Sequence, residues 1–507
     1  MLKRDFLEKP YDYMNDILLF LYNNKGQATR NELVDFFNIS LPTLNEYLSF
    51  LEQFLKEEQL QENLTLTVLG DTLYLNKAPT FSMKAMIMLF LDKSIKFHMV
   101  QQLFHKNEIN GGYFQQNYAI SSATYYRKIV ELNDLLNEFN LRIKRGKLVG
   151  EEKQIRFFFF NFFWFIFEEK TDLEKELANQ YLGLIEILQE IPRITFDHTE
   201  ILQIKLWMKI SFRRMVLEPL PTISPHDVQL DRPLFEEINL SIHTYMKRID
   251  RPYTINEAYM FYDFFCSMHN YSANAAFAFR LAKQQRIEKT YLNEMNRVIL
   301  TYLKARGYLS HYVLPIRLLY IENLLFQLHA QLYYFSGFIL PFDYWTIQSL
   351  LKVLRHPFSE SEVYELVEIA TTNFATKVTA SKYQNQFTEI NYTLILNHIA
   401  ELNEKKITIG VYHSLSSAYS ELVAQKIQQS IAGKYPLKIE PYNAENHYDL
   451  LLMNTNNEQL VAQYDHYYIF SDISNRYDLQ SIEKIIQLLV KSIILCKILY
   501  NVLPVSH

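Results

Sequence analysis

Apolar residues recur at intervals of three and four along most of the chain up to about residue 400, a spacing that predicts a mainly helical protein. After residue 406 the pattern changes. Residues 406–411 and 467–470 read as short buried strands, with helical patterns between and after them, which predicts a small α/β domain. The breaks between regions are short and contain proline or polar residues. They divide the chain into five predicted domains, at residues 1–78, 79–168, 169–286, 287–402 and 403–507.

The first 150 residues contain one pattern twice. Residues 29–37 predict a short helix that begins with a capping box of Thr29 and Glu32, and a turn then leads to Ser40 at the start of a longer amphipathic helix. The same turn, serine and helix return at Ser121. A two-strand pattern follows each copy, at 64–68 with 72–75 and at 141–144 with 147–149. The repeat therefore predicts tandem winged helix-turn-helix units.

A helix-turn-helix reads DNA with hydrogen-bonding side chains near the start of its second helix, while cations contact the phosphates. The second unit combines both features, because a helix start rich in hydroxyls and cations precedes a basic wing. The first unit is poorer, since Glu46 would repel the phosphate backbone, so we expect the second unit to be the main anchor. The candidate DNA-binding residues are Ser122, Thr124, Tyr125, Arg127, Lys128, Arg142, Lys144, Arg145 and Lys147 in the second unit, and Thr43 and Asn45 in the first.

Composition narrows the choice of function. The 507 residues include 51 Lys and Arg against 56 Asp and Glu, so the net charge of −5 gives no global positive field and any DNA contact must be local. Glycine is scarce, and glycine-rich phosphate-binding motifs are absent from the sequence. Cys266 and Cys496 lie far apart, so neither a disulfide framework nor a thiolate metal cluster is expected. The sequence also lacks a catalytic constellation, and we expect a protein that is no enzyme and uses no cofactor or metal.

The amino-terminal residues carry charges throughout and have no apolar signal core. The most apolar run, residues 157–167, is about half of the ~20 residues that a membrane span requires, so it predicts a buried helix. These patterns predict a cytoplasmic protein without a membrane partner.

The segment ISSATYYRKIVELNDLLNEFNLRIKRGKLVGEEKQIRFFFFNFFW, residues 120–164, resembles the signature segment of the Mga/AtxA-like family of virulence transcriptional regulators. The step from the wing into an aromatic helix, Gly150 to Arg156, is part of this resemblance. The resemblance implies two winged helix-turn-helix units, two all-helical phosphotransferase-regulation domains (PRD) and a domain similar to enzyme IIB of the sugar phosphotransferase system. It implies a DNA-binding transcriptional activator whose partners are promoter DNA and the phosphocarrier HPr.

In the resembled family, a histidine in each PRD can accept a phosphoryl group from HPr. His198 and His398 are the candidates here, the first before a predicted helix and the second just before the α/β domain. A cysteine-type enzyme IIB has its nucleophile directly after the first strand, where this chain has Tyr412 to Ser417 and no cysteine. His413 is a possible substitute, but a degenerate domain that forms a homodimer or higher homo-oligomer fits the residues better.

Three other functions compete with this interpretation. An RNA-binding antiterminator also carries paired regulatory domains, but it starts with a β-rich module, whereas this chain starts with helical patterns. A sugar-system regulator or phosphocarrier with a working enzyme IIB-like domain would need a nucleophile in the loop after its first strand. The third is a helical scaffold that binds only protein, which a loss of specific promoter footprints at low salt would favour.

Overall fold

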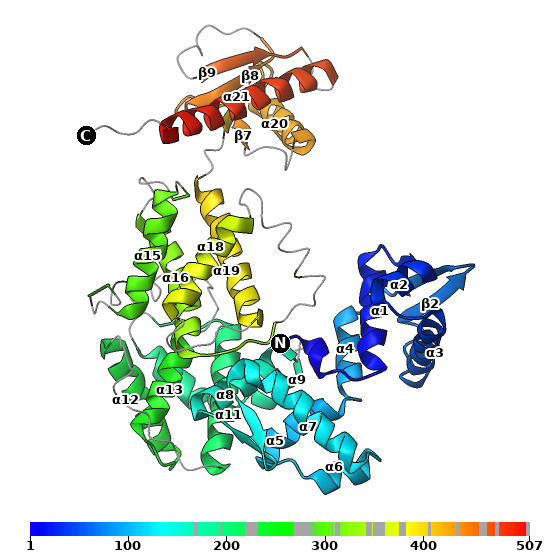
Figure 1. The fold of residues 1–507 in the computed structure, drawn as a ribbon. Coiled ribbons are helices and arrows are strands. Elements are labelled where there is room, and N and C mark those ends of the chain that lie inside the picture. The colour runs from blue at the N-terminus through cyan, green and yellow to red at the C-terminus, as the bar shows by residue number, and fades with distance from the viewer. Residues whose placement is uncertain are drawn as a thin grey trace. The chain divides into compact units, whose positions relative to one another are not determined.

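The computed structural model is mainly helical with small sheets, as the sequence predicts (Figure 1). It describes residues 1–502 except 167–170, 192–193, 218–231, 268–282, 284–285, 288–289, 307, 310–314, 341–346, 348–359, 375–381, 404–406, 432–436, 456–463 and 472–475. The chain forms two compact parts. Residues 1–302 with 314–398 make the first part, and residues 303–313 with 399–507 make the second.

The first winged helix-turn-helix unit consists of three helices and a three-stranded sheet. Its elements are α1 (Tyr11–Asn23), β1 (Gln27–Thr29), α2 (Arg30–Phe37), α3 (Leu41–Glu57), β2 (Leu64–Leu69) and β3 (Thr72–Lys77). The predicted capping box is present, because Thr29 accepts from the Glu32 amide and Glu32 accepts from the Thr29 amide. The predicted apolar stripe of α3, from Leu44 to Leu55, is buried. Strand β1 was not predicted; it adds to the edge of the hairpin in the order β1-β3-β2.

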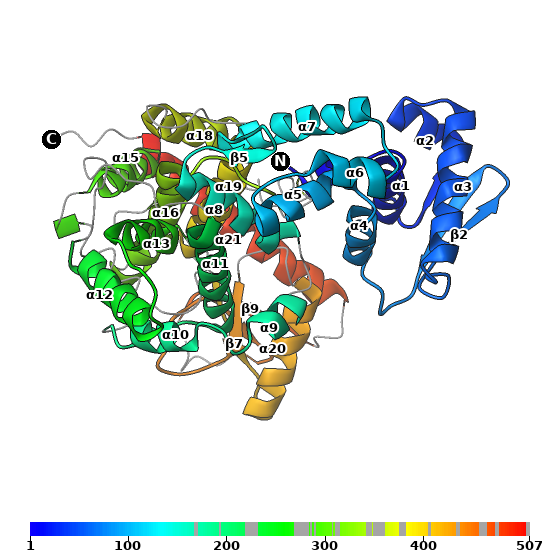
Figure 2. The ribbon, with the colours of Figure 1, turned by 90° about the horizontal axis from the view of Figure 1, so that it is seen from below.

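The second unit repeats this plan with a smaller wing. Its elements are α4 (Met83–Leu91), α5 (Ile95–Lys106), α6 (Gly111–Asn117), α7 (Ser122–Leu136), β4 (Arg142–Lys144) and β5 (Lys147–Val149). Helices α5 and α6 pack against α7, as Figure 2 shows from below. The buried face of α7 includes Leu132 and Leu136, which leaves the opposite face of the helix free.

The aromatic run continues the second unit as a buried helix, as predicted for its described residues. Helix α8 (Glu152–Asn161) passes into a π-helical turn, η3 (Phe162–Ile166); Phe167 and the predicted boundary at residue 168 lie outside the described residues. The ring of Phe157 stacks on Phe335 at 4.1 Å between centroids, and Phe160 meets Phe264 at 4.8 Å. Helix α8 therefore joins the second unit to the helices that follow it in the chain.

The middle of the chain is helical in its described residues, as predicted. The helices are α9 (Thr171–Leu177), α10 (Leu182–Gln189), α11 (His198–Leu217), α12 (Arg232–Arg248), α13 (Ile255–Cys266), α15 (Tyr291–Ala305), α16 (Pro315–Tyr334), α18 (Glu360–Phe374) and α19 (Lys382–Asn403). His329 on α16 is fully buried, where its Nδ1 lies 2.6 Å from Asn296 Oδ1 and its Nε2 lies 2.8 Å from the Tyr392 hydroxyl. Burial lowers the pKa of His329 to about 3, so the ring stays neutral and ties α15, α16 and α19 together.

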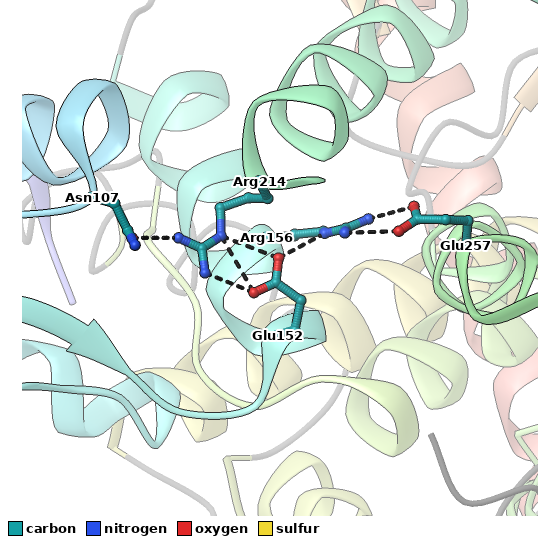
Figure 3. Close-up of polar contacts among 5 residues, drawn as sticks. All are labelled: Asn107, Glu152, Arg156, Arg214 and Glu257. Atoms are coloured by element: carbon teal, nitrogen blue, oxygen red, sulfur yellow. Dashed lines mark hydrogen bonds and ion pairs between the residues drawn. The ribbon is translucent and has the colours of Figure 1, made fainter. Parts of the chain in front are cut away.

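A buried ion network fixes α8 against the helices of the middle region (Figure 3). The Arg156 guanidinium donates to Glu257 of α13 at 2.6 and 2.9 Å and to Glu152 of its own helix at 3.0 Å. Arg214 of α11 donates to Glu152 at 2.7 Å and to Asn107, at the end of α5, at 2.6 Å. Burial opposes the charge of Arg156, but the hydrogen bonds and charge of Glu257 outweigh it and raise the pKa of Arg156.

The second part contains the predicted α/β domain. Strands β6 (Ile407–Tyr412), β7 (Leu437–Pro441), β8 (Tyr448–Met453) and β9 (Tyr464–Ile469) form a parallel sheet in the order β7-β6-β8-β9. Helices α20 (Ser417–Ile431) and α21 (Arg476–Val502) bury one face of that sheet. Two strands, β7 and β8, were not predicted. A strand is present at residues 467–469, as predicted, but the expected burial was wrong, because β9 lies at the edge of the sheet and its Tyr467 is exposed.

The network gives a stability prediction. We expect Glu257→Ala to lower the free energy of unfolding by about 3–5 kcal/mol, because it leaves the Arg156 charge buried with only Glu152 to compensate it. Urea unfolding followed by tryptophan fluorescence measures this loss, since Trp207 lies beside Phe264 in the same core. The matched control is Glu176→Ala, which removes an exposed carboxylate from a surface pair with Lys209 and should cost less than about 1 kcal/mol. Equal losses in the two variants would contradict the structural role of the network.

Candidate nucleic-acid interface

The two units begin their second helices with the same local geometry. Ser40 accepts from the Thr43 amide at 3.3 Å, and Ser121 accepts from the Thr124 amide at 3.1 Å. In each unit a left-handed residue stands at the turn before the serine, Asn38 in one and Ala119 in the other, both with φ of 49°. The hydroxyls of both threonines also lie within hydrogen-bond distance of the capping serine hydroxyls. Thr43 and Thr124 therefore take part in the helix caps, whether or not they also contact DNA.

The start of α7 is open to solvent. Ser122 is exposed, and so is the side chain of Arg127, of which 68% is accessible. Arg127 lies 3.8 Å from Glu131 in a pair that is itself exposed, so little energy holds the guanidinium there. Both predicted residues are therefore available to a ligand that approaches this end of the helix.

Tyr125 does not fit its predicted role. Its side chain is buried, and its ring lies over Gly111 so closely that a Cβ at Gly111 would stand 3.1 Å from Tyr125 Cζ. Burial also raises the pKa of Tyr125. The ring packs α7 against α6 and does not face a DNA groove, which corrects the expectation from the sequence.

Lys128 is also less available than predicted. Its ammonium lies 3.0 Å from Glu131 and 3.4 Å from Glu8, and only 12% of its side chain is exposed. Two carboxylates therefore compensate its charge. Sequence reasoning missed this because Glu8 lies far away in the chain. Lys128 serves to fasten the amino-terminal segment to α7 rather than to attract phosphates.

The wing presents a concentrated positive charge. Its strands pair Arg142 with Val149 and Lys144 with Lys147, while Ile143 and Leu148 are buried beneath them. Arg145 and Gly146 make the turn with φ values of 52° and 79°, as a two-residue hairpin requires. The wing cations, all exposed and without an ion-pair partner among the described residues, are Arg142, Lys144, Arg145 and Lys147.

An asparagine on α7 holds the wing in place. Asn133 accepts from the Ile143 amide and donates to the Ile143 carbonyl at 3.3 Å. The carbonyl of Gly146 accepts from the Ile109 amide at 2.8 Å and secures the tip. The recognition helix and the wing therefore form one rigid surface, which the sequence pattern alone did not reveal.

The first unit presents a different surface. Asn45 is exposed at the start of α3, but it is followed on the same helix by exposed Glu46 and Glu52. The tip of its wing carries Leu69 at 69% exposure and, in the turn itself, the exposed carboxylate of Asp71. Electrostatics therefore favours the second unit as the one that meets a polyanion.

The two candidate phosphorylation sites lie in different surroundings. His198 is the first residue of α11, with 77% of its side chain exposed and its Nε2 3.1 Å from Glu174. Asp197 and Glu200 form a reciprocal cap around it, at 2.7 and 2.8 Å. His398 on α19 is half-buried, with its ring 4.8 Å from that of Tyr320.

A comparison with protein families gives one relevant match. Residues 79–163 match the model of the Mga helix-turn-helix domain, and the match runs from the segment before α4 to the turn after α8. This confirms the resemblance that residues 120–164 carry. A comparison with curated proteins gives no significant match. Within the described residues, none of the helices is long and apolar enough to cross a membrane.

The contact between α7 and the wing can be tested by removing the side-chain amide of Asn133. We expect Asn133→Ala to increase hydrogen exchange at the amides of Ile143 and Leu148, because it leaves polar groups of the wing strand unpaired at a cost of about 1–3 kcal/mol. Asn137→Ala, a change of the same chemistry at the end of the same helix, is the control. If protection of the wing amides is unchanged in Asn133→Ala, the hydrogen bonds of Asn133 do not hold the wing in place.

Proposed function

We propose, from the Mga helix-turn-helix domain that residues 79–163 carry, that this protein is a transcriptional regulator that binds duplex DNA. The observation that carries the proposal is the wing, whose four exposed cations stand on a hairpin that Asn133 fixes to α7, the helix whose start is open. This arrangement supplies what DNA requires, a helix edge for the major groove and cations for the flanking phosphates. The protein is expected to act as an activator in the cytoplasm.

The charge along α7 limits how far the helix enters the groove. Ser122 and Arg127 belong to its first two turns, whereas exposed Asp134 lies in its fourth and would repel phosphates. The first three turns, which precede Asp134, are thus the portion suited to the bases. The wing then reaches phosphates on one side, and the first unit assists through Asn45 with a weaker electrostatic attraction.

Phosphorylation of His198 is the regulatory step that we propose, with HPr as the donor. The ring is exposed at the amino end of α11, where the helix dipole favours a negatively charged group. A phosphoryl group adds nearly two negative charges about 3 Å from where Glu174 now sits, so an attractive pair becomes a repulsive one. We expect α9, which carries Glu174, to move away from α11. His398 is the proposed second site, where phosphate would first have to displace the ring of Tyr320.

Self-association is proposed for the C-terminal α/β domain. The exposed edge strand β9 carries Tyr467 and Ile469 at 54% and 42% exposure, and unpaired strand edges join readily to a second copy. The loop after β6 lacks a cysteine, and the His413 ring there stacks on Tyr419 with its Nδ1 accepting from the Leu415 amide. We therefore assign this domain to a homodimer or higher homo-oligomer and not to phosphotransfer.

The DNA contact predicts a change in salt dependence. We expect Lys144→Ala with Lys147→Ala to make the slope of log K against log salt shallower by about 1.8, since each lost phosphate contact removes about 0.9. These lysines face each other across the hairpin, so the folded wing loses a repulsion and should stay intact. The control, Lys247→Ala with Arg248→Ala, removes two exposed cations from α12. A titration in which both double variants keep the wild-type slope would refute the wing as the phosphate contact.

The phosphorylation site can be mapped chemically. We expect incubation with enzyme I, HPr and phosphoenolpyruvate to place an acid-labile phosphate on His198, detected by mass mapping at alkaline pH. His198→Ala should lose that label, and His398→Ala should lose the second. His243→Ala removes another exposed histidine, on α12, and should keep full labelling. Full labelling of His198→Ala would exclude His198 as the acceptor.

A further inference from the structure

The outward face of α7 carries apolar side chains where the fold does not need them. Tyr126 is 64% exposed and Val130 is 59% exposed. They lie four residues apart, so they are neighbours on one face of the helix, together with exposed Ala123 and Arg127. The core face of the same helix is already filled by other residues, including Tyr125 and Leu132. The fold would tolerate polar residues at both positions.

The apolar pair lies within the part of α7 that can reach bases. Val130 is eight residues after Ser122, which places it roughly 12 Å further along the axis at ~1.5 Å per residue. Exposed Arg127 lies between the two apolar residues in the chain, and exposed Asp134 follows one turn beyond Val130. The apolar surface thus ends where the acidic one begins.

The chemistry of the major groove decides what such a surface can recognise. Base edges present hydrogen-bond donors and acceptors there, and the 5-methyl group of thymine is the apolar exception. A valine has no donor or acceptor, so it gains nothing at the polar edges and gains energy against a methyl group. A partner protein is less favoured, because α7 also carries exposed Arg127 and holds the basic wing through Asn133, and these cations attract a polyanion.

We infer that Val130 and the ring of Tyr126 read thymine 5-methyl groups in the major groove, so that α7 selects sites by where thymines stand. This inference rests on the proposed function, since it names what the DNA-binding surface recognises. Arg127 and the wing supply affinity for the backbone or for a neighbouring guanine, and the apolar pair supplies the discrimination.

The test uses the full-length chain and a duplex selected by it from a randomised library. Each thymine of that duplex is replaced in turn by deoxyuridine, which keeps base pairing and removes only the methyl group. We expect about fourfold weaker binding at one or more positions, the factor that corresponds to ~0.8 kcal/mol for one buried methyl-sized group. Val130→Ser should bind the thymine and deoxyuridine duplexes equally at the position that Val130 reads. Val216→Ser, which alters a valine of 67% exposure on α11, should retain the wild-type difference.

The outcomes separate the inference from the function on which it rests. Specific binding that is insensitive to deoxyuridine at all positions overturns the methyl readout and leaves DNA binding intact. A methyl effect that persists undiminished in both Val130→Ser and Tyr126→Ser overturns the assignment to these residues. If Val130→Ser alters the oligomeric state and leaves DNA binding unchanged, the inference is overturned in favour of a protein contact. If the wild-type chain enriches no duplex, both the inference and the proposed function are refuted.

Discussion

The ion network around Arg156 is the constraint on which the first part of the structure depends. A guanidinium that is 1% exposed can remain charged only if carboxylates accompany it, and Glu152 and Glu257 both do. Arg214 then shares Glu152 and reaches Asn107, so α5, α8, α11 and α13 meet at one set of charges. Because a displaced partner would leave a buried charge uncompensated, this arrangement resists sliding of the helices in a way that apolar packing alone does not. The second winged helix-turn-helix unit is therefore fixed to the helical region by buried ion pairs as well as by apolar packing.

The pairing of buried cations with carboxylates also explains which cations are available for DNA. Lys96 and Lys128 each lie close to carboxylates inside the fold, whereas the wing residues project into solvent without such partners among the described residues. The net charge of −5 hides this division, because it counts compensated and free cations alike. A protein that is acidic overall can still present a local positive surface, and the length of the wing limits that surface to a few phosphates.

Local features of the sequence predicted local features of the structure. The caps at Ser40 and Ser121, the recognition helices and both hairpins depend on residues close together in the chain, and all are present. The errors concern contacts between distant residues. Helical spacing could not show that Lys128 would meet Glu8, or that the missing side chain of Gly111 would admit the ring of Tyr125. Strand β1 was missed because three residues carry too little periodicity, and its pairing with β3 comes from the tertiary fold. The exposure of Tyr126 and Val130 could have been predicted, since neither belongs to the apolar stripe that continues to Leu136. It was missed because apolar residues in a helical pattern are readily assigned to the core.

The position of α11 determines what a phosphoryl group at its start could transmit. The helix begins at His198 and reaches the buried network through Arg214, sixteen residues later, at a distance of roughly 24 Å along its axis. A charge added at the first residue acts through the exposed pair with Glu174, which is weakly held, whereas Arg214 is held by a buried carboxylate and an amide. The pair of His198 with Glu174 is the weaker contact and should break first, so α9 should shift while the far end of α11 and the recognition helix stay in place. The proposed phosphorylation of His198 would therefore change the surface around α9 that another copy or another protein can contact, and would preserve the proposed DNA-reading surface.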